Sequence, residues 1–156
     1  MKILLIVVGK TDKGYLEEGI DLYLQRLKHY TALEVKVIPE LKNTRALTEQ
    51  QQKEREGEQI LQAAEDCEMW LLDENGKEFS SEKFAAFLDK KNQTLTKIMS
   101  FVIGGPYGFS EEVYAKAMGK IALSQMTFSH QMVRLFFVEQ LYRALTIIKG
   151  EPYHNK

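Results

Sequence analysis

The sequence predicts an α/β fold with a mainly parallel sheet and helices on both faces, and two observations indicate it. Short apolar runs alternate along the chain with longer segments whose apolar residues recur at helical spacing. This order is expected when each strand is followed by a crossover helix. The first run, Ile3–Val8, is apolar at every position, which is typical of a strand covered on both faces.

Length and composition narrow the class of protein. The 156 residues are 44% hydrophobic and 28% charged, and without a repeat or linker they fit one domain, 1–156. The net charge of −1 argues against non-specific coating of nucleic acid, but it allows recognition of one folded RNA through a local patch. No apolar run nears the roughly 20 residues that cross a bilayer, and no cleavage site follows the first strand. With Cys67 as its single cysteine, the chain is expected to be cytoplasmic, without a disulfide or a zinc site.

In the first half of the chain, strands and helices follow in simple alternation. A helix is expected over roughly 13–30, and a strand over 33–38, where Pro39 ends it. Residues 44–65 have the pattern of a long polar helix, and its run of charged and amide side chains at 50–56 is interpreted as a solvated face.

In the second half, a short strand over 69–72 is expected to end at the turn signal Asn75-Gly76. A serine cap and an acidic first turn then predict a helix. The expected elements are a helix capped by Ser80 or Ser81, a strand at 97–103, a helix from 110 to about 118, a strand at 121–123 and a helix at 131–149 that Gly150 ends.

Two adjacent loops, each directly after a predicted strand, form the candidate binding site. Gly104-Gly105-Pro106-Tyr107-Gly108 follows the fourth strand, and Ser124–His130 follows the fifth. Ligands of parallel sheets bind where such loops diverge, and glycines let a ligand approach the backbone. Met126 and Phe128 alternate with polar residues, which suits a flat heterocycle such as adenine. Alternatively, the glycine loop is only a tight turn between strand and helix, and Met126 and Phe128 only fill the hydrophobic core. The glycine loop matches neither G-x-G-x-x-G after the first strand nor G-x-x-x-x-G-K-S/T, the two common nucleotide-binding motifs.

The last helix and the tail suggest contacts with partners. The apolar positions of the helix cover more than one stripe, which favours a partner subunit. Arg134 and Arg143 on this helix, with Tyr153 and His154 in the tail, are types that grip phosphate and stack on a base.

Six stretches along the chain carry a resemblance to known proteins. They are VGK at 8–10, EGEQ at 56–59, IGGPYG at 103–108, LSQMTFSHQMVR at 123–134, EQLYRA at 139–144 and PYH at 152–154. Together they resemble the SPOUT class of methyltransferases, and within it the bacterial enzymes that methylate a pseudouridine of large-subunit ribosomal RNA. Ser129 departs from the family, which commonly has proline there.

The resemblance implies a fold and a function. The fold is a minimal α/β domain with a C-terminal trefoil knot, assembled as a homodimer. The activity is transfer of a methyl group from S-adenosyl-L-methionine (SAM), without a metal, to N3 of a pseudouridine in 23S ribosomal RNA on the assembled ribosome. Two other hypotheses are a non-catalytic RNA- or ribosome-binding module on the same fold and a flavodoxin-like binder of phosphate or nucleotide.

The resemblance also assigns roles to residues. Arg143, Tyr153 and His154 are expected on the RNA-binding and catalytic side, facing the SAM of the partner subunit. The acceptor nitrogen must lose a proton, for which His154 or His130 is a candidate base. Alternatively, catalysis rests on positioning, and Arg143 or Tyr153 stabilises the developing oxyanion. The residues expected to bind SAM are Leu72, Gly104, Gly105, Leu123, Ser124, Gln125, Met126, Thr127 and Phe128.

Overall fold

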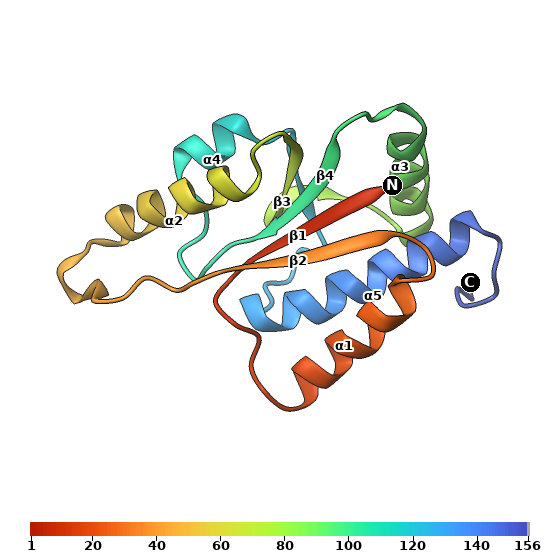
Figure 1. Ribbon diagram of the computed structural model, residues 1–156, viewed down its shortest axis with the longest axis horizontal. Coiled ribbons are helices and arrows are strands. Elements are labelled where there is room, and N and C mark those ends of the chain that lie inside the picture. The colour runs from red at the N-terminus through yellow and green to blue at the C-terminus, as the bar shows by residue number, and fades with distance from the viewer. Residues whose placement is uncertain (156) are drawn as a thin grey trace.

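The computed structural model describes residues 1–155 and consists of one sheet with helices on both sides (Figure 1). The strands pair in parallel in the order β2-β1-β4-β3-β5, so the predicted α/β fold with a parallel sheet is confirmed. The elements are β1 Lys2–Val8, α1 Tyr15–Leu27, β2 Ala32–Ile38, the 3-10 turn η1 Thr44–Ala46, α2 Glu49–Ala63, β3 Cys67–Glu78, α3 Ser81–Thr94, β4 Ile98–Ile103, α4 Glu111–Lys116, β5 Gly119–Ala122 and α5 His130–Ile148.

Strand β1 is buried on both faces, as its continuous apolar run predicts. Alternate side chains of a strand point to opposite faces, and here each face meets a different set of helices. Ile3, Leu5 and Val7 pack with residues of α1, α3 and α5. Leu4, Ile6 and Val8 pack with Ile60 of α2 and Val113 of α4. The sheet is therefore the middle of three layers, which Figure 1 shows nearly edge-on.

Strand β3 differs from the prediction, because it continues to Glu78 instead of ending at Leu72. Both Leu72 and Lys77 are paired with Ile121 of β5, so the four residues between them bulge out of the ladder. A Cβ on Gly76 would lie 2.6 Å from the backbone nitrogen of Ile121. The Asn75-Gly76 signal thus marks a close backbone approach within a strand instead of the end of one.

Side-chain caps set the helix boundaries. The helix expected from Thr44 starts instead at Glu49, because Thr48 forms a capping box with Gln51. Ser80 and Ser110 cap α3 and α4 as expected. Ser129, the position that departs from the family's usual proline, caps α5 through a 3.1 Å hydrogen bond from the Met132 N–H. A serine here therefore contributes to the start of the last helix.

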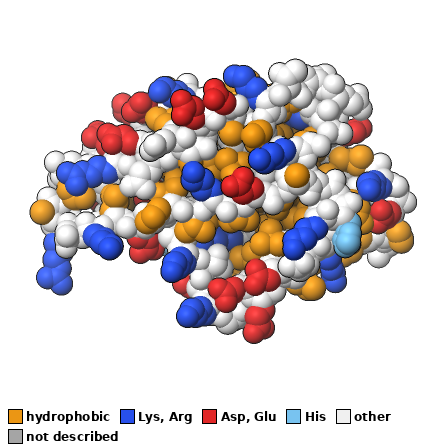
Figure 2. Space-filling model, viewed as in Figure 1, with side chains coloured by type: hydrophobic (Ala, Val, Ile, Leu, Met, Phe, Trp, Pro, Cys, Tyr) orange, Lys and Arg blue, Asp and Glu red, His pale blue; other side chains and the backbone are white. Residues whose placement is uncertain are grey.

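The face seen in Figure 2 carries Lys and Arg side chains interspersed with Asp and Glu. Strand β2 lies at one edge of the sheet, and its Val35 and Val37 are 37% and 42% exposed. This face offers no field of a single sign for non-specific binding of nucleic acid.

Two further expectations from the sequence concern a C-terminal knot and the presence of a membrane-spanning helix. The C-terminal trefoil knot implied by the family resemblance stays a prediction. Among residues 1–155, no helix combines the length and the apolar character needed to cross a membrane.

The close approach at Gly76 gives a test of the bulge. We expect Gly76→Ala to lower the free energy of unfolding by about 1–3 kcal/mol, since the added methyl group forces β3 away from β5. Asn75→Ala is the matched control, because Asn75 is exposed and a surface change of this kind costs under about 0.5 kcal/mol. Urea unfolding of both variants measures the difference, and equal stabilities would contradict the tight pairing.

Candidate active site

A cavity of about 500 Å³ opens beside the bulge of β3, where β4 and β5 end. We call it the strand-end cavity; its walls are the β3 bulge, the loop after β4, the loop after β5 and the first turn of α5. The structure brings the predicted SAM-binding residues together here, with the exception of Gln125, which is exposed and outside the lining. The predicted residues that line the cavity are Leu72, Gly104, Gly105, Leu123, Ser124, Met126, Thr127 and Phe128.

The two glycines of the β4 loop make close contacts with side chains of the protein, one in the wall of the cavity and one outside it. A Cβ on Gly104 would lie 2.9 Å from the Phe109 ring, and a Cβ on Gly105 would lie 2.8 Å from a carboxylate oxygen of Glu56. Glycine at these positions thus lets the loop lie close to α2 and to Phe109. The expectation that these glycines also leave room for a ligand stays a prediction.

Glu56 is a residue of this region that the sequence interpretation missed. It lies in the 50–56 run interpreted as a solvated face, yet it is 8% exposed. Its Oε1 accepts a 3.1 Å hydrogen bond from the Gly105 N–H. Burial raises the pKa of this carboxyl group, while the Gly105 hydrogen bond partly opposes the shift. The available signal was helical spacing, since Glu56 stands four residues before the buried Ile60.

The β3 bulge gives the strand-end cavity an acidic wall. Asp73 accepts a hydrogen bond from the Tyr114 hydroxyl, and Glu74 accepts one from the Thr127 hydroxyl. Burial and the bond to Asp73 raise the Tyr114 pKa. The lining includes both carboxylates and neither lysine nor arginine. The cavity therefore suits a cationic or neutral ligand better than an anionic one.

The predicted catalytic residues form a second cluster at the far end of α5, which we call the tail cluster. Arg143 is its centre, with Nη2 2.6 Å and Nε 2.9 Å from Glu139 Oε1. Its Nη1 is 3.0 Å from His154 Nδ1, and its guanidinium lies over the Tyr153 ring. The hydrogen bonds to Glu139 raise the Arg143 pKa, so Arg143 is a fixed cation.

The contacts of His154 define its tautomer. A guanidinium can only donate, so His154 Nδ1 accepts from Arg143 and the ring proton lies on Nε2. That nitrogen donates to Glu82 Oε1 at 2.8 Å. Both ring nitrogens are therefore engaged, and the lone pair that a general base would use already accepts from Arg143.

Tyr153 remains a hydrogen-bond donor at neutral pH. Burial and the 3.0 Å hydrogen bond between its hydroxyl and that of Tyr23 raise the Tyr153 pKa to about 12. A phenol with this pKa carries its proton under physiological conditions.

The strand-end cavity and the tail cluster are separated within one chain. His130 lines the cavity at the start of α5, while Arg143 lies thirteen residues further along this helix, roughly 20 Å at the rise of an α-helix. The tail curls back beyond the end of α5 (Figure 1). The predicted methyl-donor residues and catalytic residues thus do not form one site within one subunit.

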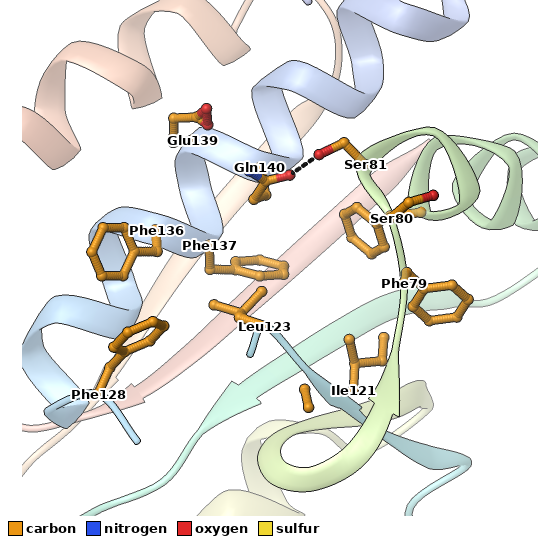
Figure 3. Close-up of a pocket in the computed structure, with 12 residues that line it drawn as sticks. Phe79, Ser80, Ser81, Ile121, Leu123, Phe128, Phe136, Phe137, Glu139 and Gln140 are labelled. Carbon is orange, nitrogen blue, oxygen red and sulfur yellow. Dashed lines mark hydrogen bonds between the residues drawn. The ribbon is translucent and has the colours of Figure 1, made fainter. Parts of the chain in front are cut away.

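A second cavity lies between them. This aromatic cavity, about 480 Å³, is bounded by β5, α3 and α5. Figure 3 shows Phe128 and Phe136 side by side at one end and the Ser81–Gln140 hydrogen bond, 2.8 Å long, at the other. It shares Ile121, Leu123 and Phe128 with the strand-end cavity, and Glu139 of the tail cluster also lines it.

Arg134, which the sequence analysis grouped with Arg143 as a phosphate-binding residue, lies in the protein interior. It is 2% exposed, so it cannot reach a phosphate on the surface. It donates to the carbonyls of Val8 and Gly9 at 2.6 and 2.9 Å. The residue therefore ties the end of β1 to α5.

Among residues 1–155, no group of three His, Cys, Asp or Glu side chains is arranged to hold a metal ion.

Comparison with known proteins places this geometry in a family. A family profile described as "Predicted SPOUT methyltransferase" matches residues 1–154. Proteins named ribosomal RNA large subunit methyltransferase H are similar over the whole length of both chains, with 57% identity in Parabacteroides distasonis, 58% in Christiangramia forsetii and 52% in Bacteroides fragilis.

A solved structure supports the same fold. It is described as a probable methylase family protein from Haemophilus influenzae and has a TM-score of 0.53 at 12% identity, covering 99% of this chain and 70% of that one. With a family profile over almost all residues and relatives more than half identical along their full length, this chain belongs to the SPOUT methyltransferase family.

Proposed function

We propose that this chain is a methyltransferase of large-subunit ribosomal RNA that uses SAM and modifies N3 of a pseudouridine. One observation carries the proposal: full-length relatives that are 52–58% identical are named ribosomal RNA large subunit methyltransferase H. The pseudouridine and its N3 atom come from the family resemblance of the sequence. A ribosomal substrate would place the protein in the cytoplasm.

The strand-end cavity fits SAM as the methyl donor. Leu72, Leu123 and Phe128 supply apolar walls for a heterocycle, and the glycine loop supplies exposed backbone. SAM would bring a methyl group on a sulfonium, a cation that becomes neutral on transfer. Asp73 and Glu74 carry the charge that such a ligand favours.

The same electrostatics weigh against the hypothesis of a phosphate or nucleotide binder. A phosphate site needs cationic side chains or a cluster of backbone donors. The strand-end cavity instead has two carboxylates and no lysine or arginine. A nucleotide carrying phosphates would be repelled at this wall.

A homodimer would complete the active site. Within one subunit the tail cluster lies far along α5 from the strand-end cavity, so the tail of one subunit would serve the donor of its partner. Most of the wide apolar face of α5 is buried within the subunit, but Phe136 remains 36% exposed beside the aromatic cavity. A second subunit seated on this face would cover it.

The tail cluster supports electrostatic catalysis in preference to a histidine base. The imide N3 must lose its proton at or before transfer of the methyl group, and the resulting negative charge is shared with the neighbouring carbonyl oxygens until N3 bonds to the methyl carbon. Arg143, fixed by Glu139 and His154, and the protonated Tyr153 are donors for that charge. In this scheme His154 holds Arg143 in place and water takes the proton.

The first test is the modification itself. In a strain that lacks the gene, mass spectrometry of 23S ribosomal RNA should find the target pseudouridine without its N3 methyl group. The wild-type gene should restore the methyl group, and Arg143→Ala should not. Unchanged methylation in the deletion strain would favour the non-catalytic RNA-binding module instead.

The second test compares the binding of ligands that differ in charge. Isothermal calorimetry should detect SAM binding to the pure protein, while ATP and FMN should bind more weakly by about tenfold or more, because like charges repel at the acidic wall. Glu74→Gln should narrow that difference. A preference for ATP or FMN over SAM would overturn the assignment of the strand-end cavity.

The third test asks whether the tail acts on the partner subunit. Gly105→Val should disable the donor site, since its side chain displaces Glu56, and deletion of 153–156 should disable the tail. Each variant alone should be inactive on ribosomes. Mixing the two by refolding should restore about a quarter of wild-type activity, because half of the dimers are mixed and each has one complete site.

A control shows that both variants are folded before mixing, by circular dichroism and gel filtration. No recovery from folded mixed dimers would mean that the tail serves its own subunit, and an active deletion variant would mean that the tail is not needed.

A further inference from the structure

Glu56 joins two elements that are distant in the sequence. It lies on α2, and its Oε1 accepts from the N–H of Gly105, 49 residues further along the chain. Glu56 is 8% exposed, and it does not line the strand-end cavity, whereas Gly104 and Gly105 do. The carboxylate therefore contacts the glycine loop from the side opposite the cavity.

This contact is costly in isolation. Burial disfavours the charged form of Glu56, and nearby Glu40 adds repulsion, so the Glu56 pKa is raised. The surrounding run from Gln50 to Arg55 is exposed or half-buried, so α2 has solvated positions for its charges. A carboxylate at the one buried position of this run therefore requires a hydrogen-bond donor, and the Gly105 N–H is that donor.

The planar peptide between the two glycines transmits the contact to the cavity. The Gly104 carbonyl and the Gly105 N–H belong to one trans peptide, so they point in opposite directions. Fixing the N–H toward Glu56 fixes the carbonyl away from α2. Within residues 1–155 no group donates to the Gly104 carbonyl, while the Gly105 carbonyl accepts from the Gly108 N–H.

We propose that Glu56 is a positioning residue that orients the Gly104–Gly105 peptide, so that the Gly104 carbonyl is presented to the methyl donor as a hydrogen-bond acceptor. The inference rests on the proposed function, since it takes SAM as the ligand of the strand-end cavity. It assigns Glu56 an action through backbone geometry, without contact with the donor.

Two substitutions separate geometry from charge. Glu56→Gln keeps the length and the acceptor oxygen but removes the charge, and its amide can face Glu40. Glu56→Asp keeps the charge but shortens the side chain by about 1.5 Å, one carbon–carbon bond, which removes the acceptor from the reach of Gly105. Glu58→Gln and Glu58→Asp are the matched controls, because Glu58 is exposed on the same helix.

Amide hydrogen exchange tests the positioning without any ligand. In the free protein the Gly105 N–H should exchange slowly in wild type and Glu56→Gln, and at least about tenfold faster in Glu56→Asp. Both Glu58 variants should match wild type. A Gly105 amide that exchanges equally in wild type and Glu56→Asp would overturn the inference.

Calorimetry with SAM tests the consequence. The Kd should be within about twofold of wild type for Glu56→Gln and weaker by about tenfold for Glu56→Asp. The reverse order would mean that Glu56 acts by its charge. A fall in thermal stability with unchanged Kd would mean that it only packs α2, and either result overturns the inference. If wild type fails to bind SAM while Gly105 exchange follows the prediction, the proposed function fails and the loop contact stands.

Discussion

The packing of α5 against the sheet is the constraint on which the rest of this structure depends. Phe137, Val138 and Leu141 are completely buried between this helix and its neighbours, and truncating one such side chain costs about 2–5 kcal/mol. The buried Arg134 reaches from the same helix to the carbonyls of Val8 and Gly9. Helix α5 therefore holds the end of β1, one wall of the strand-end cavity and the tail in fixed relation.

This fixed relation also separates two kinds of chemistry. The strand-end cavity carries carboxylates and apolar walls, which suit a cationic methyl donor. The tail cluster carries a permanent cation, Arg143, held by Glu139 and His154, which suits an acceptor that becomes negative. Because a rigid helix keeps the two apart in one subunit, the proposed dimer provides a physical route by which they would meet.

Much of the fold and the cavity could be predicted from the sequence. The apolar run of β1 indicated burial on both faces. The loops after β4 and β5, the two strands that flank β3 in the sheet, indicated one pocket, which Leu72, Gly104 and Phe128 line. Local patterns suffice there, because parallel strands place their loops at a common edge. The N-cap serines were equally readable, since a cap depends on residues within one turn.

Other features depended on tertiary contacts. The extension of β3 to Glu78 needs the backbone of β5 beside Gly76, and the burial of Glu56 needs the Gly105 N–H against α2; neither partner is near in the sequence. Arg134 has the sequence pattern of a surface arginine, yet it is buried and donates to backbone carbonyls 125 and 126 residues away. The sequence by itself determined the fold class, the loops of the cavity and the family. Tertiary structure alone decided which charges are buried, because a buried charge is set by its partners across the fold and not by its neighbours along the chain.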